Sequence, residues 1–82
     1  MPKKKFRVLS GDEIIKILER EGFAIVYGRG SHCKLARFVD GVKQKIVIPR
    51  HKEIKKGTLK AIYSQVTQYI PESRMKTHFY TG

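Results

Sequence analysis

The feature that most constrains the fold is the spacing of apolar residues, which changes twice along the chain. Residues 10–22 place isoleucines and a leucine at the intervals of an amphipathic helix, and residues 57–68 show the same spacing with Leu59, Ile62, Tyr63 and Val66. Between them, residues 23–49 (FAIVYGRGSHCKLARFVDGVKQKIVIP) are rich in the β-branched and aromatic side chains that favour strands. We therefore predict an α+β fold in which two helices bury their apolar stripes against one sheet.

Signals at the ends of the helices define their extent. Ser10 and Glu13 have the spacing of a capping box, and Gly22 can end the helix that follows, so the first helix is expected over residues 11–21. The second helix is expected over residues 57–68. A short third helix is expected after Pro71, because proline suits the first position of a helix.

The central segment predicts a three-stranded antiparallel meander. Its turn signals are Gly28-Arg29-Gly30 and Asp40-Gly41, and the second is typical of a tight hairpin. Successive side chains of a strand point to opposite faces. One face should therefore be apolar, with Cys33, Leu35, Val39, Ile46 and Ile48, and the other should hold His32, Lys34, Ala36, Phe38, Lys43, Lys45 and Val47. Pro49 should end the sheet.

The size of the chain predicts one domain with a small core, because the protein has 82 residues. We divide it into a basic N-terminal tail (1–9), the domain itself (10–69) and a C-terminal extension (70–82). The only cysteine is Cys33, and apolar runs such as Ala24 to Tyr27 are far too short to span a membrane. A cytoplasmic location without membrane association is expected.

Charge predicts a polyanionic partner. The chain has 18 Lys and Arg residues against 7 Asp and Glu residues, a formal net charge of +11, which favours nucleic acid. Lys55, Lys56 and Lys60 cluster at the start of the second predicted helix, where free amides and the helix dipole also attract phosphate. The lysines of the N-terminal tail indicate either a nucleic-acid arm or a frayed, solvated end.

His32 is the candidate for chemistry, because imidazole exchanges protons near neutral pH. It follows a glycine-flanked turn on the cationic side of the predicted sheet, beside Arg29 and Lys34. RNA cleavage needs such a group, since the 2′-hydroxyl must lose a proton and the leaving oxygen must gain one. A binding or structural role for His32 remains an alternative. A metal site is disfavoured because His32 and Cys33 point to opposite faces, and Cys33 on the apolar face is expected to be a core residue.

Three segments in order resemble the HicA family of small mRNA interferase toxins. They are Gly30-Ser31-His32, Pro49-Arg50-His51 and the Lys-Gly-Thr-Leu run at residues 56–59. The resemblance covers about residues 10–68. It implies a double-stranded-RNA-binding-domain-like fold, metal-independent cleavage of mRNA centred on His32, and neutralisation by a HicB-type antitoxin. Ser31 would shape the turn that presents the histidine.

We accordingly predict a type II toxin that cleaves mRNA, with His32 as general acid or base and no metal or small-molecule cofactor. The residues expected to hold RNA are Arg29, Ser31, Lys34, Lys55, Lys56 and Lys60. Two alternatives stay open. One is a non-catalytic RNA-binding module of the same fold, and the other is a small structural protein bound by a larger acidic partner.

Overall fold

A three-stranded antiparallel sheet with the order β2-β3-β4 is the centre of the fold, and its strands follow one another along the chain. The computed structural model describes residues 5–81. The elements are β1 (Lys5–Phe6), α1 (Gly11–Arg20), β2 (Ala24–Arg29), β3 (His32–Val39), β4 (Val42–Pro49), α2 (Lys56–Val66), α3 (Glu72–Phe79) and β5 (Tyr80–Thr81). The predicted α+β class and the order helix, three strands, helix are confirmed, consistent with the double-stranded-RNA-binding-domain-like description.

The first helix begins as its sequence predicts. The Ser10 side chain accepts a hydrogen bond from the Glu13 amide at 3.1 Å, and the Glu13 carboxylate accepts one from the Ser10 amide at 2.9 Å. The helix ends one residue earlier than expected, at Arg20, and Gly22 follows with φ +93°, a conformation that glycine adopts without strain. Hydrogen bonds with the backbone amide and the side chain of Ser10 lower the pKa of Glu13, so the ionised form of Glu13 stabilises the helix start.

Replacing Ser10 by alanine should lower the free energy of unfolding by about 1 kcal/mol at neutral pH, because it removes the hydroxyl that accepts a hydrogen bond from the Glu13 amide. Glu13 has a lowered pKa in the folded state, so its contribution is present above the pKa of the unfolded chain and is lost as the pH falls through the folded value. The difference between Ser10→Ala and the wild type should therefore shrink in acid. Urea denaturation at several pH values measures both effects, and a difference that grows in acid would contradict them.

The β3–β4 hairpin sets the register of the sheet. Asp40 and Gly41 have φ values of 51° and 79°, as a tight two-residue hairpin turn requires, and they pair Val39 with Val42. The predicted hairpin is confirmed. The first turn lies later than predicted: Gly28 and Arg29 belong to β2, where they pair with Cys33 and His32, and the turn is formed by Gly30 and Ser31. Gly28 is therefore a strand residue and not part of the turn.

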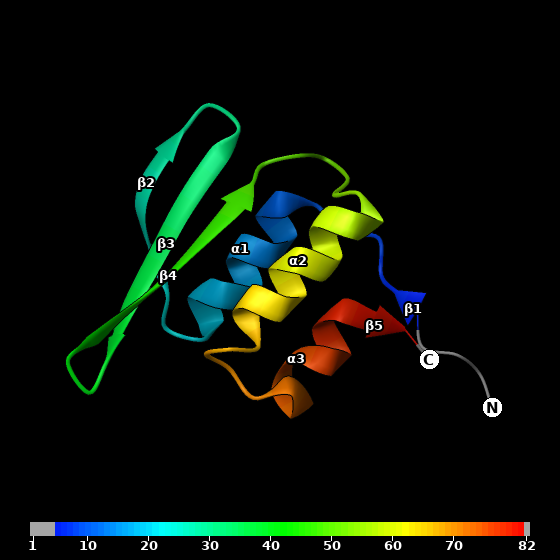
Figure 1. Ribbon diagram of the computed structural model, residues 1–82. Coiled ribbons are helices and arrows are strands. Elements are labelled where there is room, and N and C mark those ends of the chain that lie inside the picture. Colours follow the sequence, from blue (N-terminus) through cyan, green and yellow to red (C-terminus); the bar gives the residue numbers. More distant parts are fainter. Residues whose placement is uncertain (1–4, 82) are drawn as a thin grey trace.

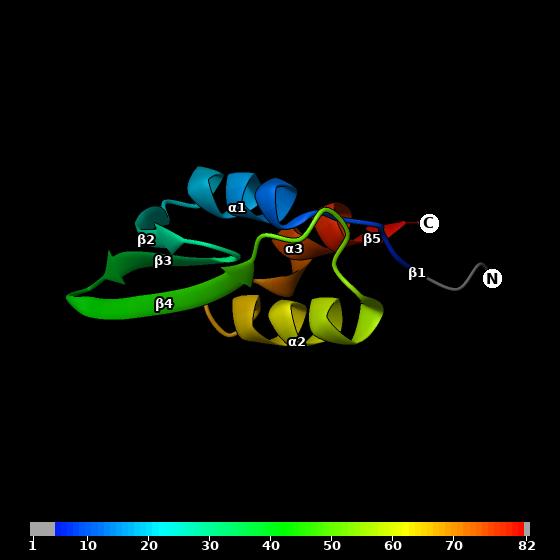
Figure 2. The same cartoon turned by 90° about the horizontal axis from the view of Figure 1, so that it is seen from above.

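Helices α1 and α2 pack on the same face of the sheet (Figures 1 and 2), so the other face is left uncovered by the part of the chain that the structure describes. The core joins apolar residues of β3 and β4 to those of α1 and α2. Its strand members are Cys33, Leu35, Ile46 and Ile48, and its helix members include Ile14, Leu18, Leu59 and Val66. The predicted alternation is confirmed, although Ala36, on the uncovered face, is buried because it is short and lies between Ala24 and Lys45 of the flanking strands.

The N-terminus of α1 lies directly against the end of β4. A Cβ atom added to Gly11 would come within 2.1 Å of the Pro49 carbonyl oxygen, so only glycine allows this approach. The Gly11 amide also donates a hydrogen bond of 2.9 Å to the carbonyl of His51. The start of α1 thereby positions the chain as it leaves the sheet.

The C-terminal residues complete the core. Met75 and Phe79 of α3 are fully buried, and β5 pairs antiparallel with β1. Leu9, in the predicted N-terminal tail, is buried in the same core. The lysines at positions 3 and 4 lie outside the described residues. The division at residues 9 and 69 stays a prediction, and the residues on both sides of each boundary share one core.

Candidate nucleic-acid interface

The turn between β2 and β3 presents the histidine singled out in the sequence. Arg29 and His32 are cross-strand partners, and Gly30 has φ +61°, which lets the chain reverse in two residues. The carbonyl of Ser31 accepts a hydrogen bond of 2.6 Å from the amide of Arg50, which ties the turn to the residue that follows β4. The turn that carries His32 is therefore fixed by the pairing of β2 with β3 and by the hydrogen bond from Arg50.

The His32 side chain is exposed. Ser31 Oγ lies 3.3 Å from His32 Nδ1, and among the described residues the hydrogen bonds of this imidazole engage only that nitrogen. Nε2 is therefore free to meet a ligand from solvent. An exposed imidazole oriented through one ring nitrogen can exchange a proton through the other.

Cations surround His32 on the uncovered face of the sheet, which we call the open face. The register of the sheet places residues of neighbouring strands side by side on this face, in rows that cross the strands. Starting at the β2–β3 turn, the rows are Arg29, His32 and Pro49, then Tyr27, Lys34 and Val47, then Ala24, Ala36 and Lys45, and finally Phe38 and Lys43. Strands β2, β3 and β4 contain no aspartate or glutamate. The Lys34 ammonium lies 5.5 Å from the centroid of the Tyr27 ring, a cation–π contact that leaves it at the surface.

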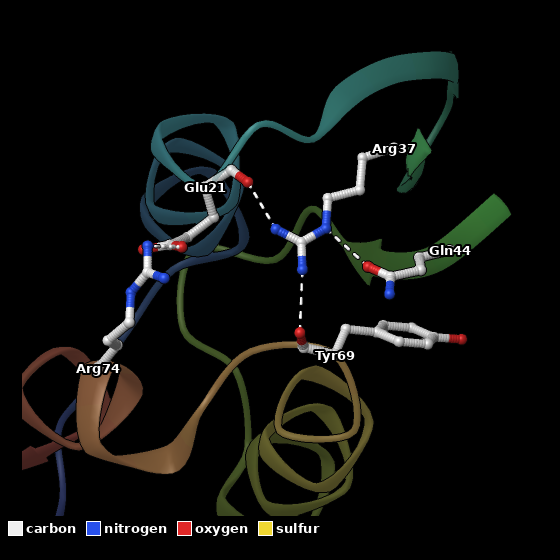
Figure 3. Close-up of polar contacts among 5 residues, drawn as sticks. All are labelled: Glu21, Arg37, Gln44, Tyr69 and Arg74. Atoms are coloured by element: carbon white, nitrogen blue, oxygen red, sulfur yellow. Dashed lines mark hydrogen bonds and ion pairs between the residues drawn. The ribbon is translucent and has the colours of Figure 1, made fainter. Parts of the chain in front are cut away.

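Arg37 lies on the opposite face of β3 and is a structural residue (Figure 3). Its Nε donates to Gln44 Oε1 at 2.6 Å, and its other nitrogens donate to the carbonyls of Glu21 at 2.7 Å and Tyr69 at 2.9 Å. The guanidinium also stacks over the Phe23 ring at 4.7 Å. Arg37 thereby joins β3 to the ends of both long helices.

Arg50 is also engaged within the protein. Its Nε lies 3.4 Å from Asp12 Oδ1 in the first turn of α1. The pair is exposed, so its contribution to stability is small. Its consequence is local, because it places the Asp12 carboxylate beside the cation that follows β4.

The lysines of α2 form a second cationic region, away from His32. Lys55 is the N-cap of α2, Lys56 is its first residue, and both they and Lys60 are exposed. Lys55 and Lys56 line a cavity of about 380 Å³ together with Lys5 and Arg7. In Figures 1 and 2 the start of α2 stands apart from the β2–β3 turn. The structure thus brings together Arg29, Ser31, His32 and Lys34 and does not add the α2 lysines to that group.

Cys33 is buried in the core, and burial raises the pKa of its thiol. A buried, protonated thiol is a poor nucleophile, in agreement with the expectation that Cys33 is a core residue. Within residues 5–81 no three His, Cys, Asp or Glu side chains are grouped so that they could hold a metal ion. Within the same residues no helix is both long and apolar enough to cross a membrane.

Four charged or aromatic residues of the open face were not among the residues that the sequence assigned to RNA: Tyr27, Phe38, Lys43 and Lys45. Lys43 and Lys45 were placed on the correct face but were left out of the candidate site. The signal that could have selected them is the Asp40-Gly41 turn, because it pairs Val39 with Val42 and so places Lys43 beside Phe38 and Lys45 beside Ala36.

Comparison with known families identifies the chain. The family model described as HicA toxin of bacterial toxin-antitoxin matches residues 11–67. The chain belongs to the HicA toxin family. The match runs from the first residue of α1 to the residue after α2, and it contains the open face and the α2 lysines.

The family gives the chain a role as a toxin that is paired with an antitoxin. No curated protein and no solved structure matches it. Helix α3 and strand β5 lie beyond the matched residues, so the part of the core that they supply is outside the HicA match.

Proposed function

We propose that this HicA-family toxin is a metal-independent endoribonuclease that cleaves mRNA, with His32 as its general acid or base. The observation that supports this most directly is the placement of His32. It is an exposed imidazole on a fixed turn, and Arg29 and Lys34 are its neighbours on a face whose strands contain no carboxylate. Membership of a toxin family agrees with an activity that is harmful to the cell.

The chemistry fits the residues of this face. The RNA 2′-hydroxyl attacks the adjacent phosphorus, the bond from phosphorus to the 5′ oxygen breaks, and the products are a 2′,3′-cyclic phosphate and a 5′-hydroxyl. One proton leaves the 2′-oxygen and one reaches the 5′-oxygen, and His32 would transfer one of them. Arg29 and Lys34 would stabilise the negative charge that develops on the phosphoryl oxygens.

The wider RNA contact would use Arg29, Ser31, Lys34, Lys55, Lys56 and Lys60. The cognate inhibitor would be a HicB-type antitoxin in the cytoplasm, and an acidic surface on it would associate rapidly with a chain of net charge +11. An antitoxin that covered His32 would block the proposed reaction directly.

The test is cleavage of a mixed-sequence RNA by the purified protein in excess chelator, followed by analysis of the product ends. We expect internal cuts with 2′,3′-cyclic phosphate and 5′-hydroxyl ends. Binding without cleavage under any buffer condition would support the RNA-binding module instead. Cleavage that chelator abolishes would contradict the metal-independent mechanism.

The contribution of the α2 lysines can be tested separately. Exchanging Lys55 and Lys56 for glutamine should reduce the slope of log affinity against log salt by about 1.4 for single-stranded RNA, since each phosphate contact contributes about 0.7. Fluorescence anisotropy over a series of salt concentrations measures the slope. The double variant Lys16→Gln/Lys76→Gln removes the same charge from α1 and α3 and is the control. An equal change in both double variants would mean that α2 holds no phosphate of its own.

A further inference from the structure

The open face is one continuous surface that no other element within residues 5–81 covers. Cross-strand pairing aligns His32, Lys34 and Phe38 of β3 with Arg29 and Tyr27 of β2 and with Val47, Lys45 and Lys43 of β4. The helices all lie on the other side of the sheet or beyond its edge (Figure 2). A ligand can therefore approach this face along the whole length of β3.

The charge of the open face is entirely positive. Lys34, Lys43 and Lys45 are exposed, and with Val26 and Val47 they line a groove of about 320 Å³. The only cation of β3 on the other face, Arg37, is bound to backbone carbonyls and to Gln44. A row of free lysines without a neighbouring carboxylate on their strands matches the regular negative charge of a phosphodiester backbone.

Aromatic rings occur on the same face. Phe38 is 70% exposed and Tyr27 is 49% exposed, although burying such rings in the core would be favourable. An exposed ring on the open face of a sheet offers a platform on which an unpaired base can stack. A duplex hides the faces of its bases, so it gains nothing from these rings. The combination therefore favours unpaired RNA over a duplex.

We propose that the open face binds an unpaired segment of RNA along β3, with a base stacked on Phe38, phosphates on Lys43 and Lys45, and the reacting phosphate at His32. From His32 to Phe38 the strand spans about 20 Å, which accommodates several nucleotides. This inference rests on the proposed function for the identity of the substrate. It specifies that the bound RNA is single-stranded and that it runs along β3. It also adds Lys43, Lys45, Phe38 and Tyr27 to the binding residues.

The first test is binding of a short 2′-O-methyl RNA of mixed sequence, as a single strand and as a duplex with its complement. The modified sugar cannot act as a nucleophile, so binding is measured without cleavage. We expect the single strand to bind more tightly. The variant Lys43→Gln/Lys45→Gln should reduce its salt slope by about 1.4, and the control Lys16→Gln/Lys76→Gln should leave the slope within 0.3 of the wild type.

The second test is Phe38→Leu, which keeps an apolar side chain and removes the aromatic ring. Loss of one stacked base should weaken binding of the single strand by about 5- to 150-fold and leave the duplex unaffected. The control is Val8→Ala, because Val8 is as exposed as Phe38 and lies outside the sheet. Circular dichroism and thermal melting of each variant show whether it is folded.

The outcomes separate this inference from the proposed function. Selective weakening of the single strand by the Lys43/Lys45 and Phe38 variants supports the inference, even for a protein that cleaves nothing. Equal binding of single strand and duplex, or unchanged binding by these folded variants, overturns it while leaving cleavage by His32 intact. In that case the open face would bind a protein partner. Measuring how tightly an acidic antitoxin segment binds the wild type and the same variants would test that role.

Discussion

Replacing His32 by glutamine is expected to slow RNA cleavage by about 100- to 10,000-fold, the usual contribution of a general acid or base. Glutamine keeps a polar side chain of similar size but cannot exchange a proton at neutral pH. Because His32 is exposed, the free energy of unfolding should change by less than about 0.5 kcal/mol. The loss should therefore be in the rate of cleavage and not in the fraction of folded protein.

Single-turnover cleavage with enzyme in excess measures this effect without interference from product release. His78→Gln is the matched control, because His78 lies in α3, outside the open face, and its exchange should leave the rate within about twofold. Binding of the 2′-O-methyl single strand should also persist in His32→Gln. A folded His32→Gln protein that cleaves at the wild-type rate would remove His32 from the mechanism.

Replacing Arg37 by lysine should lower the free energy of unfolding by about 3 kcal/mol, although the charge is kept. The guanidinium donates in different directions to Gln44 and to the carbonyls of Glu21 and Tyr69, and one ammonium group cannot reach all of them. The exchange leaves half-buried acceptors without a donor, which costs more than the lost bonds themselves.

Urea denaturation of Arg37→Lys and of Arg29→Lys provides the comparison. Arg29 is an exposed residue of the same sheet, so the identical chemical change there should alter the free energy of unfolding by less than about 0.5 kcal/mol. Equal stabilities of the two variants would show that the contacts of Arg37 contribute no more than those of a surface arginine.

The sheet and its two faces could be predicted because their determinants are local. Asp40-Gly41 sets the register of β3 and β4, and strict alternation then assigns each side chain to a face. The same logic placed His32, Lys34 and Phe38 together. Alternation also places Arg37 on the apolar face with Cys33 and Leu35, where a cation needs hydrogen-bond acceptors. Its structural role could therefore have been predicted from the sequence.

The remaining features depend on contacts between distant segments. Nothing in the sequence says that the carbonyls of Glu21 and Tyr69 would converge on Arg37, because they follow different helices. The separation of the α2 lysines from His32 depends on the path of residues 50–55, which contain no regular element. The pairing of β1 with β5 joins segments that are too short to be recognised as strands.

The pairing of β1 with β5 has a consequence for how the chain folds. Met75 and Phe79 follow the strands and both long helices along the chain, yet they are fully buried in the core, and β5 pairs back with β1. Synthesis proceeds from the N-terminus, so the strands and both long helices leave the ribosome before the residues that complete their packing. The closing contacts span nearly the whole sequence and form at a high entropic cost. The core that joins the sheet to both long helices is therefore complete only when α3 has packed against them.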